Sequence, residues 1–185
     1  MATQTLPERI GEAFELDARL TVAGRKLEAG DPAPDFELDH FDPTDNVIHS
    51  VKLADSTGQI RLLNVINSLD TPVCHIETHH WDKLRDELPP GVMIYTISMD
   101  LPFAQDRWQK AEHVTHSALS GHRSEKFGQD YGVLIKEWRL LQRAVFVIDG
   151  TGHIVYAEYV ADQMREPDYK KPVQVVRQLA SENHG

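Results

Sequence analysis

Apolar and polar residues alternate along the chain in blocks that predict an α/β fold. Two almost continuously apolar segments, 60–66 and 92–97, are typical of short buried strands. Between them, residues 72–88 place apolar side chains three to five positions apart, which predicts a helix. In the last third, apolar runs at 144–148 and 154–156 flank an Asp-Gly-Thr-Gly turn and predict a β-hairpin.

Shorter elements are expected around this framework. Residues 102–113, 125–131 and 173–179 have the patterns of helices, and residues 114–118 have the pattern of a weaker strand. The order of strands and helices predicts an α/β fold with a central mixed β-sheet flanked by helices. We find no internal repeat and no linker long enough to separate domains.

The N-terminal region carries weaker patterns. Residues 1–18 mix apolar, polar and charged residues, and their apolar residues show at best the spacing of a helix. We expect them to form a loosely attached arm. Residues 20–27 predict a β-hairpin with its turn at Ala23-Gly24, and the alternation around Phe36 predicts an edge strand. We therefore divide the chain into an arm, 1–18, and one domain, 19–182, which opens with this hairpin.

Composition and charge narrow the function classes. The chain has 185 residues, of which 41% are hydrophobic and 26% are charged, as in ordinary globular proteins. Lys and Arg number 19 against 29 Asp and Glu, so the net charge of −10 disfavours binding to nucleic acid or to anionic membranes. No secretory signal and no apolar segment of membrane-spanning length are present in the sequence, and we expect a cytoplasmic protein.

The sequence contains a single cysteine, Cys74, which excludes an intramolecular disulfide and cysteine-rich metal sites built from one chain. Thr71 and Pro72 suit the N-cap and first position of the predicted helix, which places Cys74 in its first turn. Unpaired N–H groups and the helix dipole favour a thiolate there. Arg143, directly before an apolar strand, is a candidate cation for it. The alternatives are a buried structural cysteine and an ordinary surface arginine.

Five segments, in the same order, resemble the bacterial thiol peroxidases, a subfamily of the peroxiredoxins. The similarity extends from about Gly24 to Leu179, and Asp-Leu-Pro-Phe-Ala-Gln is its most specific motif. The segments are 70–74, 98–105, 127–133, 143–149 and 166–169. This resemblance implies a thioredoxin-like fold and a thiol-dependent peroxidase without a cofactor.

The resemblance also implies roles for individual residues. Cys74 matches the peroxidatic cysteine, whose thiolate attacks the peroxide bond and becomes a sulfenic acid. Thr71 matches a hydroxyl that hydrogen-bonds the thiolate and the peroxide, and Arg143 matches an arginine that holds both electrostatically. The implied substrates are hydrogen peroxide or small organic hydroperoxides, and the implied assembly is a homodimer.

Two positions depart from the family pattern. Asn67 replaces a proline that shields the sulfur, which predicts a wetter, less ordered site or a new polar contact. Gln109 replaces the resolving cysteine, so the sulfenic acid must be reduced by an external thiol, from a thioredoxin-like protein or a low-molecular-weight compound, or through a bridge between chains. The same departures motivate an alternative: a catalytically impaired redox-sensing or interaction module.

The histidines near Cys74 raise a further possibility. His75 and His79 are four residues apart on one helix face and could bind a metal with Cys74 nearby, while His80 and His113 lie further along. The sequence shows no outlying residue that completes a ligand set. We therefore expect no metal site, and assign these histidines to a solvated helix face or to core packing.

Overall fold

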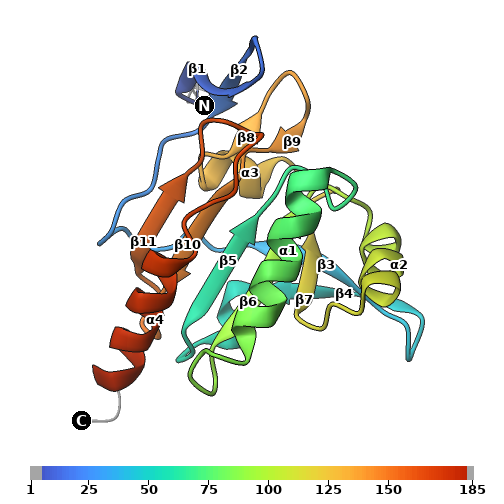
Figure 1. Cartoon of the computed structure of the whole chain (residues 1–185), viewed down its shortest axis with the longest axis vertical. Coiled ribbons are helices and arrows are strands. Elements are labelled where there is room, and N and C mark those ends of the chain that lie inside the picture. The colour runs from blue at the N-terminus through green and yellow to red at the C-terminus, as the bar shows by residue number, and fades with distance from the viewer. Residues whose placement is uncertain (1–5, 183–185) are drawn as a thin grey trace, which may run out of the picture.

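A seven-stranded sheet forms the centre of the structure, a computed structural model that describes residues 6–182 (Figure 1). In spatial order the strands are β11 (Ile154–Tyr159), β10 (Ala144–Ile148), β5 (Arg61–Val65), β6 (Met93–Ser98), β7 (Ser117–Ser120), β3 (Glu37–Asp42) and β4 (Val47–Lys52). The β5–β6 and β6–β7 pairs are parallel and the other pairs are antiparallel. The predicted mixed sheet is therefore confirmed.

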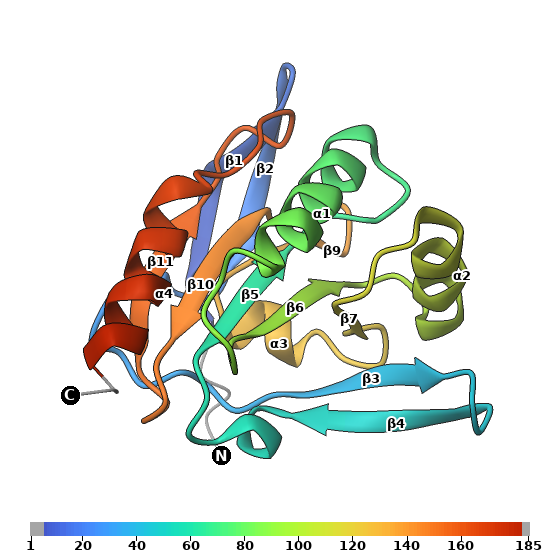
Figure 2. The ribbon, with the colours of Figure 1, turned by 60° about the horizontal axis from the view of Figure 1, so that its bottom comes forward.

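In the part of the chain that the structure describes, a smaller sheet and four α-helices complete the fold. The small sheet has the order β1 (Glu8–Glu15), β2 (Ala18–Ala23), β8 (Leu134–Ile135) and β9 (Leu140–Leu141). The helices are α1 (Pro72–Arg85), α2 (Pro102–Glu112), α3 (Lys126–Asp130) and α4 (Lys170–Glu182), with a 3-10 turn, η1 (Leu53–Ser56). Helices α1 and α4 lie on one face of the large sheet, and α3 lies on the other (Figure 2). None of the helices within residues 6–182 has the length and apolar character needed to cross a bilayer.

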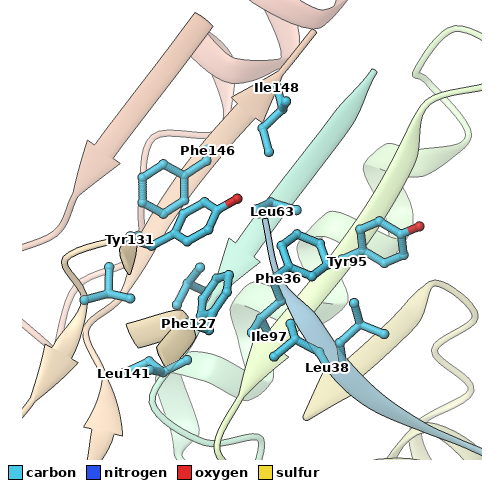
Figure 3. Packing of buried hydrophobic residues seen from close by; sticks show 14 of the residues in the cluster. Phe36, Leu38, Leu63, Tyr95, Ile97, Phe127, Tyr131, Leu141, Phe146 and Ile148 are labelled. Atoms are coloured by element: carbon cyan, nitrogen blue, oxygen red, sulfur yellow. The ribbon is translucent and has the colours of Figure 1, made fainter. Parts of the chain in front are cut away.

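Strand β5 is buried along its whole length because both faces of the sheet are covered. Successive side chains of a strand point to opposite faces, so Leu62 joins one core and Leu63 joins the other. Leu62 packs with Trp81 of α1 and Val176 of α4. Leu63 belongs to an aromatic-rich core that includes Phe127 of α3 (Figure 3). Packing in both cores fixes the position of β5, and therefore the point at which the chain leaves the sheet and enters α1.

The strongly patterned segments form the predicted elements, with small differences at their ends. Helix α1 ends at Arg85, three residues before the predicted end, and the 144–156 hairpin is present as β10 and β11. Strand β7 begins at Ser117 rather than at residue 114. The reason is that the backbone N–H groups of Thr115 and His116 donate to Asp82 of α1, so these residues are tied to the helix before the strand begins.

The prediction of a loose arm at residues 1–18 is wrong for residues 8–15, and residues 1–5 lie outside the described part. Residues 8–15 form β1, which pairs with β2, so a boundary at residue 18 would cut a β-hairpin. The spacing of the apolar residues suggested a helix for two reasons. Ile10 is 85% exposed in the strand, and a bulge between Ile10 and Ala13 changes which residues face inward. The predicted N-terminal hairpin exists, but as β1 and β2 rather than within residues 20–27.

The predicted edge strand near Phe36 is not at the edge. Strand β3 pairs with β4 on one side and with β7 on the other, so β4 forms the edge of the sheet. The apolar residues of β4 do not alternate with polar ones, none of them is buried, and Val47 is 47% exposed, so no pattern predicted this strand. Charged and polar side chains on an edge strand, here His49, Ser50 and Lys52, disfavour pairing with other chains.

Candidate active site

The loop between β5 and α1 positions Cys74. Asp100, which follows β6, accepts hydrogen bonds from the Ser68 hydroxyl at 2.7 Å and from the Leu69 backbone N–H at 2.9 Å. This contact holds the loop at the carboxyl ends of β5 and β6, and α1 begins directly after it. Cys74 lies in the first turn of α1 and is fully buried, in contact with a small apolar cluster that includes Trp108 of α2. The helix dipole favours a thiolate at this position.

Arg143 reaches Cys74 from the neighbouring strand. It precedes β10, which runs antiparallel to β5 and pairs Ala144 with Val65, so the backbone of Arg143 lies beside the start of the Cys74 loop. The Arg143 Nη1 atom donates to the Cys74 Sγ atom at 3.3 Å, and the side chain is 1% exposed. The structure therefore brings together the two residues that the sequence analysis proposed as nucleophile and cation.

Glu77 is a third member of this group. It lies one turn beyond Cys74 on the buried face of α1 and accepts a hydrogen bond from Nη1 of Arg143, the nitrogen that also contacts the sulfur. Burial raises the pKa of Glu77 to about 8, although Arg143 acts to lower it. Burial therefore favours the neutral form of this carboxyl. The positive charge of Arg143 is then available to a thiolate at Cys74.

Arg143 stays charged in this buried position. Burial lowers its pKa, but the neighbouring Glu77 and Cys74 outweigh burial and raise the pKa on balance. Its guanidinium is further held by the backbone carbonyl of Gln163, which accepts from Nη2 at 2.8 Å. A fixed cation beside a first-turn sulfur is an arrangement that activates a thiolate and stabilises charge on an incoming oxygen.

Asn67 forms a new polar contact rather than a wet site. The side chain is 5% exposed, and its Nδ2 atom donates to the carbonyl of Leu141 at 2.6 Å and to Oε1 of Gln163 at 3.0 Å. The same Gln163 oxygen accepts the backbone N–H of Arg143 at 3.0 Å. Asn67 and Gln163 together hold the backbone and side chain of Arg143 in place. Of the two outcomes predicted for Asn67, the structure shows the polar contact.

Thr71 occupies the predicted N-cap position but does not use its hydroxyl as a cap. The hydroxyl donates to the Ser68 carbonyl at 2.9 Å, so its single proton is not directed at Cys74. The Thr71 oxygen keeps lone pairs that can accept a hydrogen bond. Gln109, at the position of the family's resolving cysteine, lies on α2 and donates from Nε2 to the His116 carbonyl at 2.5 Å.

Sequence reasoning missed Glu77 and Gln163. For Glu77 a signal was available, because Cys74, Glu77 and Trp81 recur at the spacing of one helix face and all three are buried. Gln163 lies in the segment between β11 and α4, where no periodic pattern indicates which side chain turns inward.

The chain resembles known proteins over most of its length. The sequence model of the AhpC/TSA family matches residues 29–157. A thiol peroxidase of Bacillus subtilis is 42% identical over 161 residues, which cover 86% of this chain and 93% of that protein. Among solved structures, a peroxiredoxin-like protein from Aquifex aeolicus has a TM-score of 0.81 at 29% identity and covers 92% of this chain and 98% of its own. A thiol peroxidase from Chromobacterium violaceum shares the fold, with a TM-score of 0.77 at 22% identity. The match covers 94% of this chain and 97% of that protein.

Proposed function

Because the chain belongs to the AhpC/TSA family, we propose that it is a thiol-dependent peroxidase with Cys74 as its nucleophile. The observation that carries this proposal is the 3.3 Å contact between the Arg143 Nη1 atom and the Cys74 sulfur inside the buried core. Hydrogen peroxide and small organic hydroperoxides are the substrates that such an enclosed sulfur favours, because Cys74 has no exposed surface in the resting structure.

The first half of the reaction oxidises the thiolate. Its electron pair attacks the terminal oxygen of the hydroperoxide, the S–O bond forms as the O–O bond breaks, and the sulfur becomes a sulfenic acid. The departing oxygen leaves with the bonding pair and takes up one proton, so that the proton released by the thiol ends on water or on an alcohol. Arg143 stabilises the negative charge as it moves from sulfur to the departing oxygen.

Thr71 has a positioning role in this scheme. Its hydroxyl proton is given to the Ser68 carbonyl, which leaves the oxygen free to accept the O–H of a bound hydroperoxide. That contact would point the terminal oxygen of the peroxide toward Cys74, three residues further along α1.

The second half of the reaction depends on thiols from outside the chain. Cys74 is the only cysteine in the 185 residues, so no resolving cysteine is available within the chain. One external thiol condenses with the sulfenic acid, releasing water and forming a mixed disulfide, and a second thiol releases Cys74. A thioredoxin-like protein or a low-molecular-weight thiol would serve, and we place this chemistry in the reducing cytoplasm.

A homodimer is part of the proposal. Leu101 and Phe103, at the start of α2, are 54% and 55% exposed, and the Phe103 ring packs against Phe41 of β3 with centroids 5.1 Å apart. Exposed apolar side chains grouped in this way are typical of surfaces that bind another protein. Sedimentation of the wild type and of Phe103→Ser would test it: the wild type should sediment as a dimer and the variant as a monomer, whereas a monomeric wild type would contradict it.

Stopped-flow measurement of the reduced protein with hydrogen peroxide tests the peroxidase proposal. We expect Cys74 to be oxidised at least about 100-fold faster than free cysteine, given the contribution of a fixed charge donor such as Arg143. Cys74→Ser, which keeps the size of the side chain, is the matched control and should show no thiol oxidation. A rate equal to that of free cysteine would overturn the enzyme proposal. Recovery of one specific protein disulfide in that case would favour the redox-sensing alternative.

A further inference from the structure

Three side chains that the peroxidase mechanism does not use meet on the surface beside Cys74. His75 and His79 project from α1, and Glu112 projects from the end of α2. Both imidazole Nε2 atoms face the same carboxylate oxygen: Glu112 Oε2 lies 3.6 Å from that of His75 and 3.1 Å from that of His79. All three side chains are partly exposed, so an ion can enter from solvent.

We propose that His75, His79 and Glu112 form a binding site for a divalent metal ion of the zinc type. Two imidazoles and one carboxylate are a ligand set that zinc accepts, with a fourth position left for water. Ligand atoms bound to zinc at about 2.0–2.2 Å in tetrahedral geometry lie about 3.3–3.6 Å apart. The two nitrogen-to-oxygen distances in this structure are close to that range, and the three ligand atoms lie within 4.8 Å of one another.

The surroundings hold the imidazoles in this arrangement. The rings of His75 and His79 pack against Trp108 of α2, with centroid distances of 5.3 Å and 5.6 Å, and against each other at 4.8 Å. This packing leaves both Nε2 atoms directed toward Glu112. A site whose ligands are already oriented loses less conformational entropy when the ion binds.

The sequence alone could not complete this site. His75 and His79 showed the spacing of a metal-binding helix face, but Glu112 is 33 residues beyond His79 and approaches only because α2 packs beside α1. The expectation of no metal site rested on the absence of that third ligand.

A second group of possible ligands, Asp42, Asp45 and His49, lies around the turn between β3 and β4. It has one imidazole instead of two, and the His49 and Asp45 side chains are 48% and 46% exposed. Zinc prefers nitrogen over carboxylate oxygen when both are offered. The first group is therefore the stronger site, and His49 provides a control for the second.

The site is adjacent to Cys74 but separate from it. Trp108 contacts both imidazoles on one side and belongs to the apolar cluster around Cys74 on the other. An ion held between α1 and α2 would tie together the two helices that enclose the sulfur. Cys74 itself is buried beside Arg143 and is not one of the ligands.

Zinc titration of the reduced, chelator-treated full chain tests the proposal, with a chromophoric chelator as competitor. We expect one zinc ion per chain, bound at least about tenfold more weakly by His79→Gln and by Glu112→Gln. His80→Gln is the matched control, because His80 is the next residue of the same helix and stacks on Tyr169 instead. Zinc should raise the midpoint of thermal unfolding of the wild type and of His80→Gln by more than that of the two ligand variants.

Other outcomes would overturn the assignment. Loss of zinc binding in Cys74→Ser would show that the thiol binds the ion, and loss in His49→Gln would place the ion at the β3–β4 turn. Unchanged binding in both ligand variants, or no binding by the wild type at micromolar zinc, would also contradict it. The two ligand variants lie on different helices, and thermal unfolding without metal shows whether each is folded.

Discussion

Glu77→Gln tests the charge arrangement around Cys74, because it keeps the shape of the side chain and removes its ability to ionise. The Glu77 side chain is fully buried and accepts a hydrogen bond from Arg143 on Oε2. Its other oxygen, Oε1, has no hydrogen-bond partner among the described residues. A carboxylate with so little solvation is costly, and burial accordingly raises the pKa of Glu77 from the ordinary 4.5 to about 8.

The raised pKa determines how stability changes with pH. Between pH 4.5 and 8 the folded protein holds a proton on Glu77 that the unfolded chain releases. The free energy of unfolding of the wild type therefore falls as pH rises through this range, by up to about 1.4 kcal/mol per pH unit. Glutamine does not titrate, so the Gln variant lacks this decline. Below pH 4.5 both states hold the proton and the difference between the two proteins is constant.

Urea unfolding at several pH values between 4.5 and 8 measures this difference. A Cys74→Ser background removes the thiol, so that no thiol titrates in the same range. We expect Glu77→Gln to gain stability relative to its parent with each step in pH. Glu87→Gln, which changes an exposed carboxylate just beyond the same helix, should show no such trend. If Glu77 is instead ionised in the folded protein and paired with Arg143, both states are ionised above pH 4.5, and the stability difference between the Gln variant and its parent stays constant from pH 4.5 to 8. That constant difference would refute the reasoning.

Substitutions at three further positions, Arg143, Asn67 and Trp81, test the site and the core. Arg143→Gln should lower the rate of peroxide reduction by about 100-fold, whereas Arg139→Gln, on the surface, should leave it unchanged in stopped-flow measurements. Asn67→Ala removes two hydrogen bonds and should cost about 1–3 kcal/mol in urea unfolding. Asn67→Pro removes the same bonds and should not raise the peroxide rate; a large gain would identify Asn67 as an impairing substitution. Trp81→Ala, fully buried between α1 and the sheet, should cost about 3–5 kcal/mol in urea unfolding.

The elements that could be predicted are those with a pattern set by burial on one or two faces. Strand β5 and helix α1 are of this kind, and their junction places Cys74 in a first turn, which the Thr71-Pro72 pair also indicated. Strand β1 was missed because its bulge breaks the alternation and leaves Ile10 facing solvent. Local patterns identify an element only where burial repeats regularly along it.

Some residues of the candidate site could also be predicted from the sequence, and others could not. Cys74 and Arg143 could be proposed because one lies at a helix start and the other at a strand start, and the family resemblance matched both. Gln163 could not, because its role depends on contacts between segments that are far apart in the sequence. Its side chain meets Asn67 and the backbone of Arg143 only in the folded protein.

The N-terminal hairpin supports the same contacts from the other side. The backbone N–H of Phe14 in β1 donates to the carbonyl of Ala161 at 2.8 Å, and the N–H of Gln163 donates to the carbonyl of Phe14 at 2.9 Å. These two bonds hold the segment after β11, whose Gln163 binds both the backbone and the guanidinium of Arg143. The position of Arg143 beside Cys74 therefore depends on backbone contacts of Phe14, which lies 129 residues earlier in the chain. Residues 8–15 are part of the support of the site, and for that reason they cannot be a detachable arm.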